Sequence, residues 1–232
     1  MTTDLLRYSL EGTTATIAMD DGKANALSYA MIDALLEALG RAEREASAIV
    51  LAGRPEKFCA GFDLKVMMAG PDAARQLLRR GSELLMRLYA TPLPLVIACT
   101  GHAIAGGALV VLTGDVRIGA AGAFRLGLNE VSIGLPVPML AMELARDRLA
   151  AAALPRATLG AQMYAPDEAV AAGYLDAVVP ADELAARAAQ EAARLGGLAR
   201  LAYRATKERL RGATIARITA GLDDDMARLL PA

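Results

Sequence analysis

The stretch from Gly101 to Asp115, GHAIAGGALVVLTGD, decides the fold, because an apolar strand, a turn with two adjacent glycines and an apolar helix follow one another in it. A helix N-terminus offers unpaired backbone N–H groups and the positive end of the helix dipole, and glycine lets a ligand approach that backbone closely. The helix ALVVLTG is apolar on every side, so we expect it to be buried. The turn is therefore predicted to bind an oxyanion in a dry site, where donors act more strongly than in water.

Two common nucleotide-binding loops are excluded at this turn. A Walker A loop needs a lysine and a serine or threonine directly after its last glycine, whereas Gly106 and Gly107 are followed by alanine and leucine. A dinucleotide-binding loop needs the spacing G-x-G-x-x-G, but Ala103 stands where the second glycine is required, counting from Gly101. The ligand of this turn is therefore not predicted to be a nucleotide phosphate.

Composition and charge exclude several classes of function. The chain has 232 residues, 55% of them hydrophobic and 22% charged, which is enough for a sizeable core. Its 25 basic and 26 acidic residues nearly cancel, so we expect no nucleic-acid partner. Cys59, Cys99 and the single histidine, His102, are too few and too scattered for a metal site. We predict no metal, and two buried free thiols in a reducing cytoplasm.

No targeting or membrane-spanning segment is predicted. The N-terminal sequence MTTDLLRYSLEG lacks a basic segment followed by an apolar run, so it is not expected to be a signal peptide. Each apolar stretch is interrupted by Arg, Asp or Pro before it reaches the roughly 20 residues that a membrane span needs. The sequence predicts a soluble, cytoplasmic protein without a membrane partner.

Strand and helix patterns alternate along most of the chain. Ser28 can cap a helix whose apolar residues recur at helical spacing over 28–45. Further helices are predicted over 72–90, 108–114 and 139–154, and strands over 5–11, 14–20, 48–53, 93–101, 115–119 and 123–129. Residues 58–65 are predicted to be a strand end followed by a turn. This alternation favours an α/β core.

The pattern changes after residue 155. Only residues 174–180 still indicate a strand, and a helical region is predicted from about Glu183 onward. The helix over 198–212 carries five basic residues: Arg200, Arg204, Lys207, Arg209 and Arg211. A run of this kind is typical of a solvent-exposed basic face, and contact with a phosphate is the second interpretation.

Four further motifs accompany the glycine turn: KANALS at 23–28, FCAGFDLK at 58–65, FRLGLNEVSIGLP at 124–136 and APDEAVAAGYLDAVVP at 165–180. Together, and in this order, they resemble the crotonase superfamily of enoyl-CoA hydratases and isomerases. The resemblance implies an α/β spiral of ββα units over residues 1–180 that binds acyl-CoA thioesters. It also implies a C-terminal helical region over 181–232 that forms homotrimers, often paired into hexamers. Coenzyme A belongs to the substrate, and no separate cofactor is implied.

The resemblance assigns an oxyanion hole to two backbone N–H groups, those of Phe62 and Gly106. Removing a proton beside a thioester places negative charge on its oxygen, and losing one such donor typically costs about 2.7–4 kcal/mol of transition-state stabilisation. The family usually has a smaller residue at the position of Phe62, so its ring is expected to narrow the acyl pocket. The alternative interpretations are a plain tight turn at Gly106 and a core aromatic residue at position 62.

The same resemblance bears on the acid–base chemistry. Hydratases of the family use two glutamates, and the matching positions here are Glu130 and Leu109. Because leucine can neither hold water nor move a proton, we expect an isomerase in which Glu130 alone transfers a proton from C2 to C4. Apolar neighbours should raise the pKa of Glu130. The alternatives are a hydratase, a non-catalytic acyl-CoA-binding subunit and a structural Glu130 that caps a turn or pairs with Arg125.

Coenzyme A is expected to contact the backbone near two motifs, at Lys23 and Ala24 and at Ala60 and Gly61, with Lys23 as a phosphate ligand. Leu109 is expected to border the acyl group. Three other residues are given structural roles, Asp63 in ordering its turn, Asp115 in capping a helix and His102 in packing. The chain ends earlier than many members of the family, so part of their acyl pocket is expected to be missing.

Overall fold

The computed structural model describes residues 5–229, and its larger sheet has six strands in the order β1-β2-β3-β5-β7-β9. The predictions about a leader sequence and an early chain end rest partly on residues 1–4 and 230–232, which lie outside the described residues. Only the pair β1 and β2 is antiparallel, as the predicted hairpin requires, and the other pairs are parallel. The strands are β1 (Leu6–Glu11), β2 (Thr14–Met19), β3 (Ala48–Ala52), β5 (Leu95–Cys99), β7 (Val116–Ala120) and β9 (Ala177–Val179).

A second, parallel sheet has three strands in the order β4-β6-β8, namely β4 (Glu56–Cys59), β6 (Gly101–Ile104) and β8 (Leu126–Gly127). Each of these strands directly follows a strand of the larger sheet in the chain and precedes a helix. The unit strand, strand, helix therefore recurs along the chain. The predicted α/β spiral of ββα units is confirmed.

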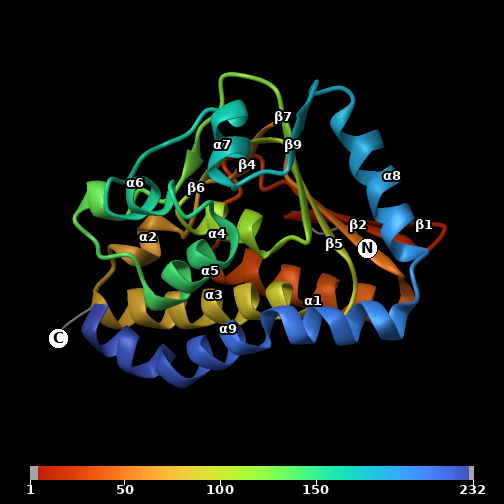
Figure 1. Ribbon diagram of the computed structural model, residues 1–232. Coiled ribbons are helices and arrows are strands. Elements are labelled where there is room, and N and C mark those ends of the chain that lie inside the picture. The colour runs from red at the N-terminus through yellow and green to blue at the C-terminus, as the bar shows by residue number, and fades with distance from the viewer. Residues whose placement is uncertain (1–4, 230–232) are drawn as a thin grey trace.

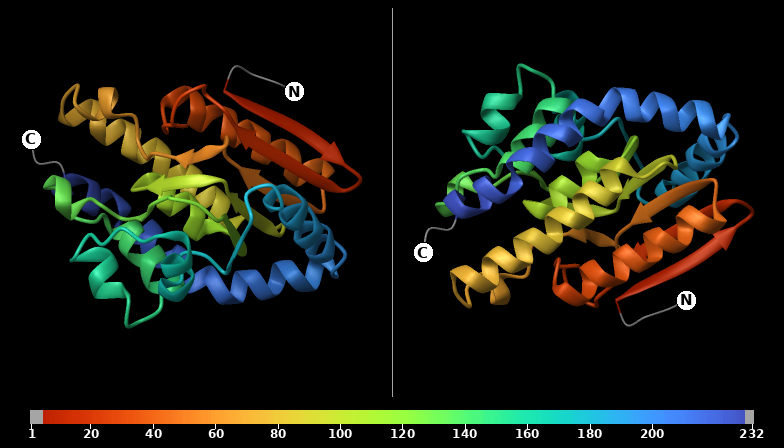
Figure 2. Two further views of the ribbon diagram at one scale, coloured as in Figure 1. Left: turned by 90° about the horizontal axis from the view of Figure 1, so that it is seen from above. Right: turned by 90° about the horizontal axis from the view of Figure 1, so that it is seen from below.

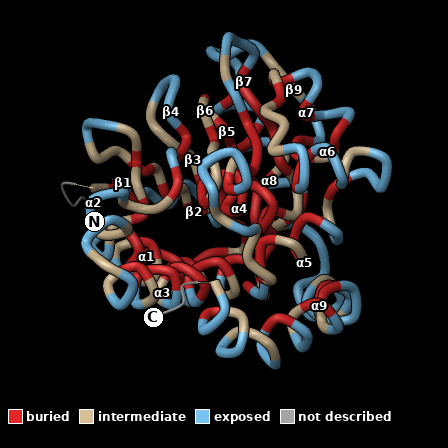
Figure 3. The backbone as a smooth tube through the Cα atoms, turned by 90° about the vertical axis from the view of Figure 1, so that its left-hand side faces the viewer, coloured by how far each residue is buried: buried red, intermediate tan, exposed pale blue. Residues whose placement is uncertain are grey.

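Helices cover both faces of the larger sheet (Figure 1). One core lies between the sheet and α1 (Tyr29–Glu45), α3 (Pro71–Ala90) and α4 (Gly106–Thr113), while α9 (Arg200–Leu229) packs against α3. A smaller core lies on the other face, beneath α8 (Leu184–Gly196). Figure 3 shows buried strands and a buried α4 inside more exposed helices. As predicted, Ser28 caps α1, accepting a hydrogen bond from the Met31 amide at 3.2 Å.

The remaining elements are short and can be followed by their colours in the views from above and below (Figure 2). They are α2 (Leu64–Met67), a 3₁₀ helix (Val131–Ile133), α5 (Met139–Arg148), α6 (Leu154–Thr158) and α7 (Pro166–Ala172). The single helix predicted over 139–154 ends at Arg148, because Leu149 has an extended backbone and a new helix starts before Pro155. The strand predicted over 123–129 is only two residues long.

The predicted solvent-exposed basic face on the last helix is wrong for two of its residues. Lys207 and Arg211 are buried in α9, with 7% and 2% of their surface exposed. Both form ion pairs with the carboxylate of Asp115, each at 2.7 Å. Asp115 also accepts a hydrogen bond from the Leu95 amide at 2.8 Å, so its structural role is wider than a helix cap. The reason is long-range packing, since α9 contacts α3 and α5 along its length.

Cys59 and Cys99 are buried free thiols, as predicted, and burial raises the pKa of each to about 12. Within residues 5–229, no helix has the length and apolar character needed to cross a membrane. The division into a core over 1–180 and a helical region over 181–232 stays a prediction, as does trimerisation.

Candidate active site

Three of the sequence motifs meet at one edge of the smaller sheet. The turn with Gly61 and Phe62 follows β4, the turn with Ala105 and Gly106 follows β6, and Glu130 comes three residues after β8. All three strands are parallel, so their carboxyl ends lie at the same edge. Ligand sites in parallel sheets form beyond such an edge. The structure therefore brings together the residues that the sequence singled out.

The backbone around Phe62 directs its N–H group away from the neighbouring segment. Leu27 donates a hydrogen bond to Gly61 O at 2.8 Å and accepts one from the Asp63 amide at 3.3 Å. In a parallel bridge of this kind, the residue between the two bonds points its own N–H and C=O to the opposite side. Within residues 5–229, the Phe62 amide donates to no acceptor. It is therefore available to a ligand.

The second amide comes from Gly106, the first residue of α4, whose N–H has no partner inside the helix. A Cβ on Gly61 would lie 3.3 Å from the Gly106 nitrogen, so the two turns touch. Ala105 precedes the helix with φ 51° and ψ −120°, a conformation that costs an L-residue strain and is typical of functional sites. Its amide donates to Gly127 O at 2.9 Å, which fixes the turn to β8.

Gly107 allows α4 to begin this close to β4. A Cβ at position 107 would lie 2.0 Å from the Cys59 carbonyl oxygen, a separation that real atoms do not show. The second glycine of the pair therefore serves packing, whereas the first presents the amide.

The ring of Phe62 packs between α3 and α4. A Cβ on Gly81 of α3 would lie 2.1 Å from the ring, and a Cβ on Gly106 would lie 3.1 Å from it. The ring is half-buried and packs against the larger core. Gly81 therefore makes the space that this aromatic residue needs, and the expectation that the ring narrows an acyl pocket stays a prediction.

Glu130 is a buried carboxyl group with one unpartnered oxygen. Only 8% of its surface is exposed, and its Oε2 atom has no hydrogen-bond partner within the described part of the chain. Burial raises the pKa of Glu130 above its ordinary value. The alternative of an ion pair with Arg125 finds no support among the ion pairs of residues 5–229. An uncompensated buried carboxyl group is costly, which is characteristic of a residue kept for chemistry.

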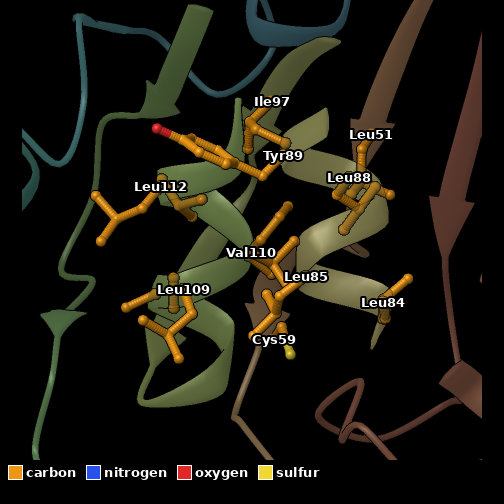
Figure 4. Close-up of a cluster of buried hydrophobic side chains, with 14 of the residues drawn as sticks. Leu51, Cys59, Leu84, Leu85, Leu88, Tyr89, Ile97, Leu109, Val110 and Leu112 are labelled. Atoms are coloured by element: carbon orange, nitrogen blue, oxygen red, sulfur yellow. The ribbon is translucent and has the colours of Figure 1, made fainter. Parts of the chain in front are cut away.

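Leu109 lies one helical turn after Gly106, and its amide donates to Ala105 O at 3.1 Å. Only 3% of its surface is exposed. Figure 4 shows Leu109 on the side of α4 away from Leu84 and Leu85 of α3, while Val110 points toward them. The position therefore provides an apolar wall beside the glycine turn.

The two segments expected to contact coenzyme A lie side by side. The Ala60 amide donates to Ala24 O at 3.0 Å, and Lys23, one residue earlier than Ala24, is exposed.

Sequence reasoning missed Asn25, whose side chain holds these two segments together. Its fully buried amide group donates to Met19 O, Lys57 O and Phe58 O, each at 3.1 Å. The signal was present in the KANALS motif, since asparagine tolerates the φ of 52° found there.

Two more of the structural roles given to side chains can be compared with the structure. Asp63 caps α2 and accepts a hydrogen bond from the Lys65 amide at 2.9 Å, as predicted for a residue that orders its turn. His102 accepts one from the Arg125 amide at 3.1 Å through Nδ1 and packs edge-on against Phe124. His102 lies near the amino-terminal end of β6, away from the edge that carries Glu130.

Comparisons with known proteins agree with this geometry. A family model described as enoyl-CoA hydratase/isomerase matches residues 10–228. The chain is also 31% identical over 217 residues to human mitochondrial enoyl-CoA delta isomerase 1, covering 91% of this chain and 72% of that relative. The chain belongs to the enoyl-CoA hydratase/isomerase family. The predicted crotonase superfamily is thereby confirmed.

Solved structures support membership of the hydratase/isomerase family over nearly the whole chain. An enoyl-CoA hydratase/isomerase family protein from Pseudomonas syringae matches with a TM-score of 0.95 and 40% identity, covering 98% of this chain and 99% of that one. An enoyl-CoA hydratase from Mycobacterium ulcerans Agy99 matches with a TM-score of 0.92 and 41% identity, covering 96% and 98%. Relatives with both names are thus similar to this chain, so the comparisons leave the reaction open.

In this member of the hydratase/isomerase family, sequence reasoning also missed Tyr174. The residue is fully buried, and its hydroxyl has no partner in hydrogen-bond geometry among the described residues. Burial and the nearby Tyr164 and Glu130 raise its pKa. The rings of Tyr174 and Tyr164 lie 5.6 Å apart. A protonated hydroxyl therefore lies near the buried carboxyl group of Glu130. Tyr174 belongs to the motif at 165–180, and the sequence analysis gave this tyrosine no role.

The raised pKa of Glu130 predicts a pH-dependent stability. The folded state holds this proton more tightly than the unfolded chain, which ionises first as the pH rises. The free energy of unfolding therefore falls between the unfolded and the folded pKa, by about 1.4 kcal/mol for each tenfold difference in proton affinity. We expect Glu130→Gln to be more stable relative to wild type at pH 8 than at pH 4. Urea unfolding at both pH values measures this, and an equal difference would contradict a raised pKa.

Proposed function

We propose that the protein is an enoyl-CoA isomerase, which moves the double bond of a 3-enoyl-CoA thioester into conjugation with Glu130 as the single acid–base group. The observation that carries the proposal is a buried carboxyl group with an unpartnered oxygen, Glu130, at the same edge of the smaller sheet as two turns with free backbone amides. Family membership supports an enoyl-CoA substrate.

The reaction needs one base and one oxyanion site. The Glu130 carboxylate removes a proton from C2 of the substrate, and the electrons of that bond move toward the thioester carbonyl to form a dienolate. The Phe62 and Gly106 amides stabilise the negative oxygen, a contribution that increases in a site without water. The protonated Glu130 then returns the proton at C4. No atom is gained or lost overall, and the product is the conjugated 2-enoyl thioester.

Leu109 favours isomerisation over hydration. Adding water across a double bond requires a group that holds and activates the water, and an apolar, buried side chain supplies none. The same residue keeps water away from the dienolate, which protects the intermediate during the transfer. Lys23 and the adjoining backbone at Ala24, Ala60 and Gly61 would hold coenzyme A. The exposed lysine lies beside the hydrogen bond that joins these two segments.

A side-by-side assay tests the proposed reaction. Purified protein is given 3-enoyl-CoA or 2-enoyl-CoA, and the absorbance of the conjugated enoyl thioester is followed. We expect 3-enoyl-CoA to gain conjugation while 2-enoyl-CoA is not hydrated.

Two other outcomes would contradict the proposal. Loss of conjugation from 2-enoyl-CoA would mean that water is activated without a glutamate at position 109, as in a hydratase. Saturable binding of both substrates without turnover would indicate an acyl-CoA-binding subunit.

A further inference from the structure

Tyr174 lies in the core beside the short segment that joins β8 to Glu130. Gly173, with φ 91°, ends α7, and the Tyr174 amide then donates to Ala169 O at 2.8 Å. No part of Tyr174 is exposed. The backbone amide of Leu128 lowers the pKa of the Tyr174 hydroxyl, although burial raises it far more. The hydroxyl therefore lies close to Leu128, two residues before Glu130.

A second tyrosine packs against the first. Tyr164 and Leu126 of β8 exchange two backbone hydrogen bonds, at 3.0 and 2.8 Å, and the rings of Tyr164 and Tyr174 lie 5.6 Å apart. Both hydroxyls are buried and have no hydrogen-bond partner within residues 5–229. Phenylalanine would fill the same space at either position without burying an unpaired donor, which costs free energy. Two such hydroxyls in one ring pair therefore call for an explanation.

The two hydroxyls face different charges. Burial is the largest influence on both, and it raises the pKa of each tyrosine. Beyond burial, Tyr164 and the carboxylate of Glu130 raise the pKa of Tyr174. The charges that act on Tyr164 belong instead to Arg156 of α6, which lowers its pKa, and Glu168 of α7, which raises it. Tyr174 is therefore the tyrosine that interacts with Glu130.

Glu130 needs a donor of the kind that Tyr174 offers. Its buried Oε2 atom has no partner among the described residues, and burial raises its pKa more than its own backbone amide lowers it. Removing a proton from C2 requires the ionised form, which a hydrogen-bond donor stabilises. Asn129 Oδ1 is another buried acceptor that lacks a partner within residues 5–229. It is neutral, however, and a bond to an ionised acceptor is roughly twice as strong.

We propose that Tyr174 is a positioning residue for Glu130. Its hydroxyl donates toward Glu130 Oε2, directly or through one shared water, and leaves the other carboxyl oxygen to face the substrate. The bond stabilises the carboxylate that removes the proton from C2 and restrains it until the proton reaches C4. This role rests on the function proposed above, in which Glu130 is the acid–base group.

An NMR titration of the Glu130 carboxyl carbon tests the bond without any substrate. The full chain is labelled with carbon-13 in its glutamate carboxyl groups, and the Glu130 signal is the one absent from Glu130→Gln. We expect Tyr174→Phe to raise the pKa of Glu130 by about one pH unit or more, because the variant loses a donor to the charged form. The matched control is Tyr164→Phe, which removes the other buried hydroxyl of the ring pair and should leave this pKa unchanged.

Kinetics on 3-enoyl-CoA provide the second readout. We expect Tyr174→Phe to lower kcat about tenfold, because an unrestrained base is less often in the productive geometry, and to leave KM within about twofold. The acid limb of the pH profile of kcat/KM should move to higher pH together with the pKa of Glu130. Tyr164→Phe should retain the wild-type kcat and pH profile.

Both variants should fold, since each loses only a buried hydroxyl that has no partner among the described residues, and urea unfolding checks this. The positioning role is overturned if the pKa of Glu130 is the same in wild type and Tyr174→Phe, or if kcat and the pH profile are unchanged. An equal pKa change in Tyr164→Phe would also overturn it, because it would indicate a packing effect. The titration needs no turnover, so these results are separate from an active Glu130→Gln, which would contradict the proposed function itself.

Discussion

Replacing Glu130 with glutamine is expected to lower kcat on 3-enoyl-CoA by about 10²–10⁴-fold, the usual contribution of a positioned acid–base group. Glutamine has nearly the same shape but cannot accept the proton from C2. The backbone amides of Phe62 and Gly106 remain in place, so the affinity for a saturated acyl-CoA should change little. Steady-state kinetics and calorimetric binding measure the two quantities separately.

The matched control for this variant is Glu37→Gln, an exposed position on α1, which should leave kcat unchanged. Glu130→Gln itself should fold, because glutamine keeps the shape of a buried side chain whose Oε2 atom has no partner among the described residues. A variant that binds acyl-CoA and still turns over at the wild-type rate would show that Glu130 is not the acid–base group.

Local sequence patterns were sufficient for most individual helices and strands. The helical spacing after Ser28 and the strand patterns around it predict α1 and the neighbouring strands, because each element depends on residues close in the chain. The motifs at Gly61, Gly106 and Glu130 each follow a short strand of the smaller sheet. Their meeting follows from the parallel order of those strands, which the sequence pattern does not state and the family resemblance supplied.

What the sequence could not reveal depends on contacts between distant segments. Lys207 is 92 residues from Asp115 in the chain, and its basic neighbours made a solvent-exposed face the natural interpretation. The burial of the Tyr174 hydroxyl depends on packing by segments far away in the chain. Ala18, Ala52 and Ala98 are a further example, since they lie on separate strands that only the register of the larger sheet brings together.

Asp115→Ala is expected to reduce the free energy of unfolding by about 3–5 kcal/mol, the range for breaking a buried ion pair by removing one partner. The substitution would leave Lys207 and Arg211 buried without their carboxylate partner, and it would remove the acceptor of the Leu95 amide. Denaturant unfolding measures the change as a shift in midpoint at constant slope. The control is Glu208→Ala, whose partner Arg204 is 58% exposed and whose loss should cost less than about 1 kcal/mol.

The large expected loss of stability in Asp115→Ala follows from the position of Arg211, which connects α9 to the ends of α3 and α4. Its guanidinium donates to Thr113 O at 3.0 Å and Gly114 O at 3.2 Å, at the carboxyl end of α4, and to Tyr89 O at 2.7 Å near the end of α3. A cation there complements the negative end of the α4 dipole, while Gly106 lies at the opposite, positive end. Asp115 is the carboxylate with which both this cation and Lys207 pair. If Asp115→Ala cost no more than Glu208→Ala, then α9 would not be anchored through this cluster, and packing alone would hold it.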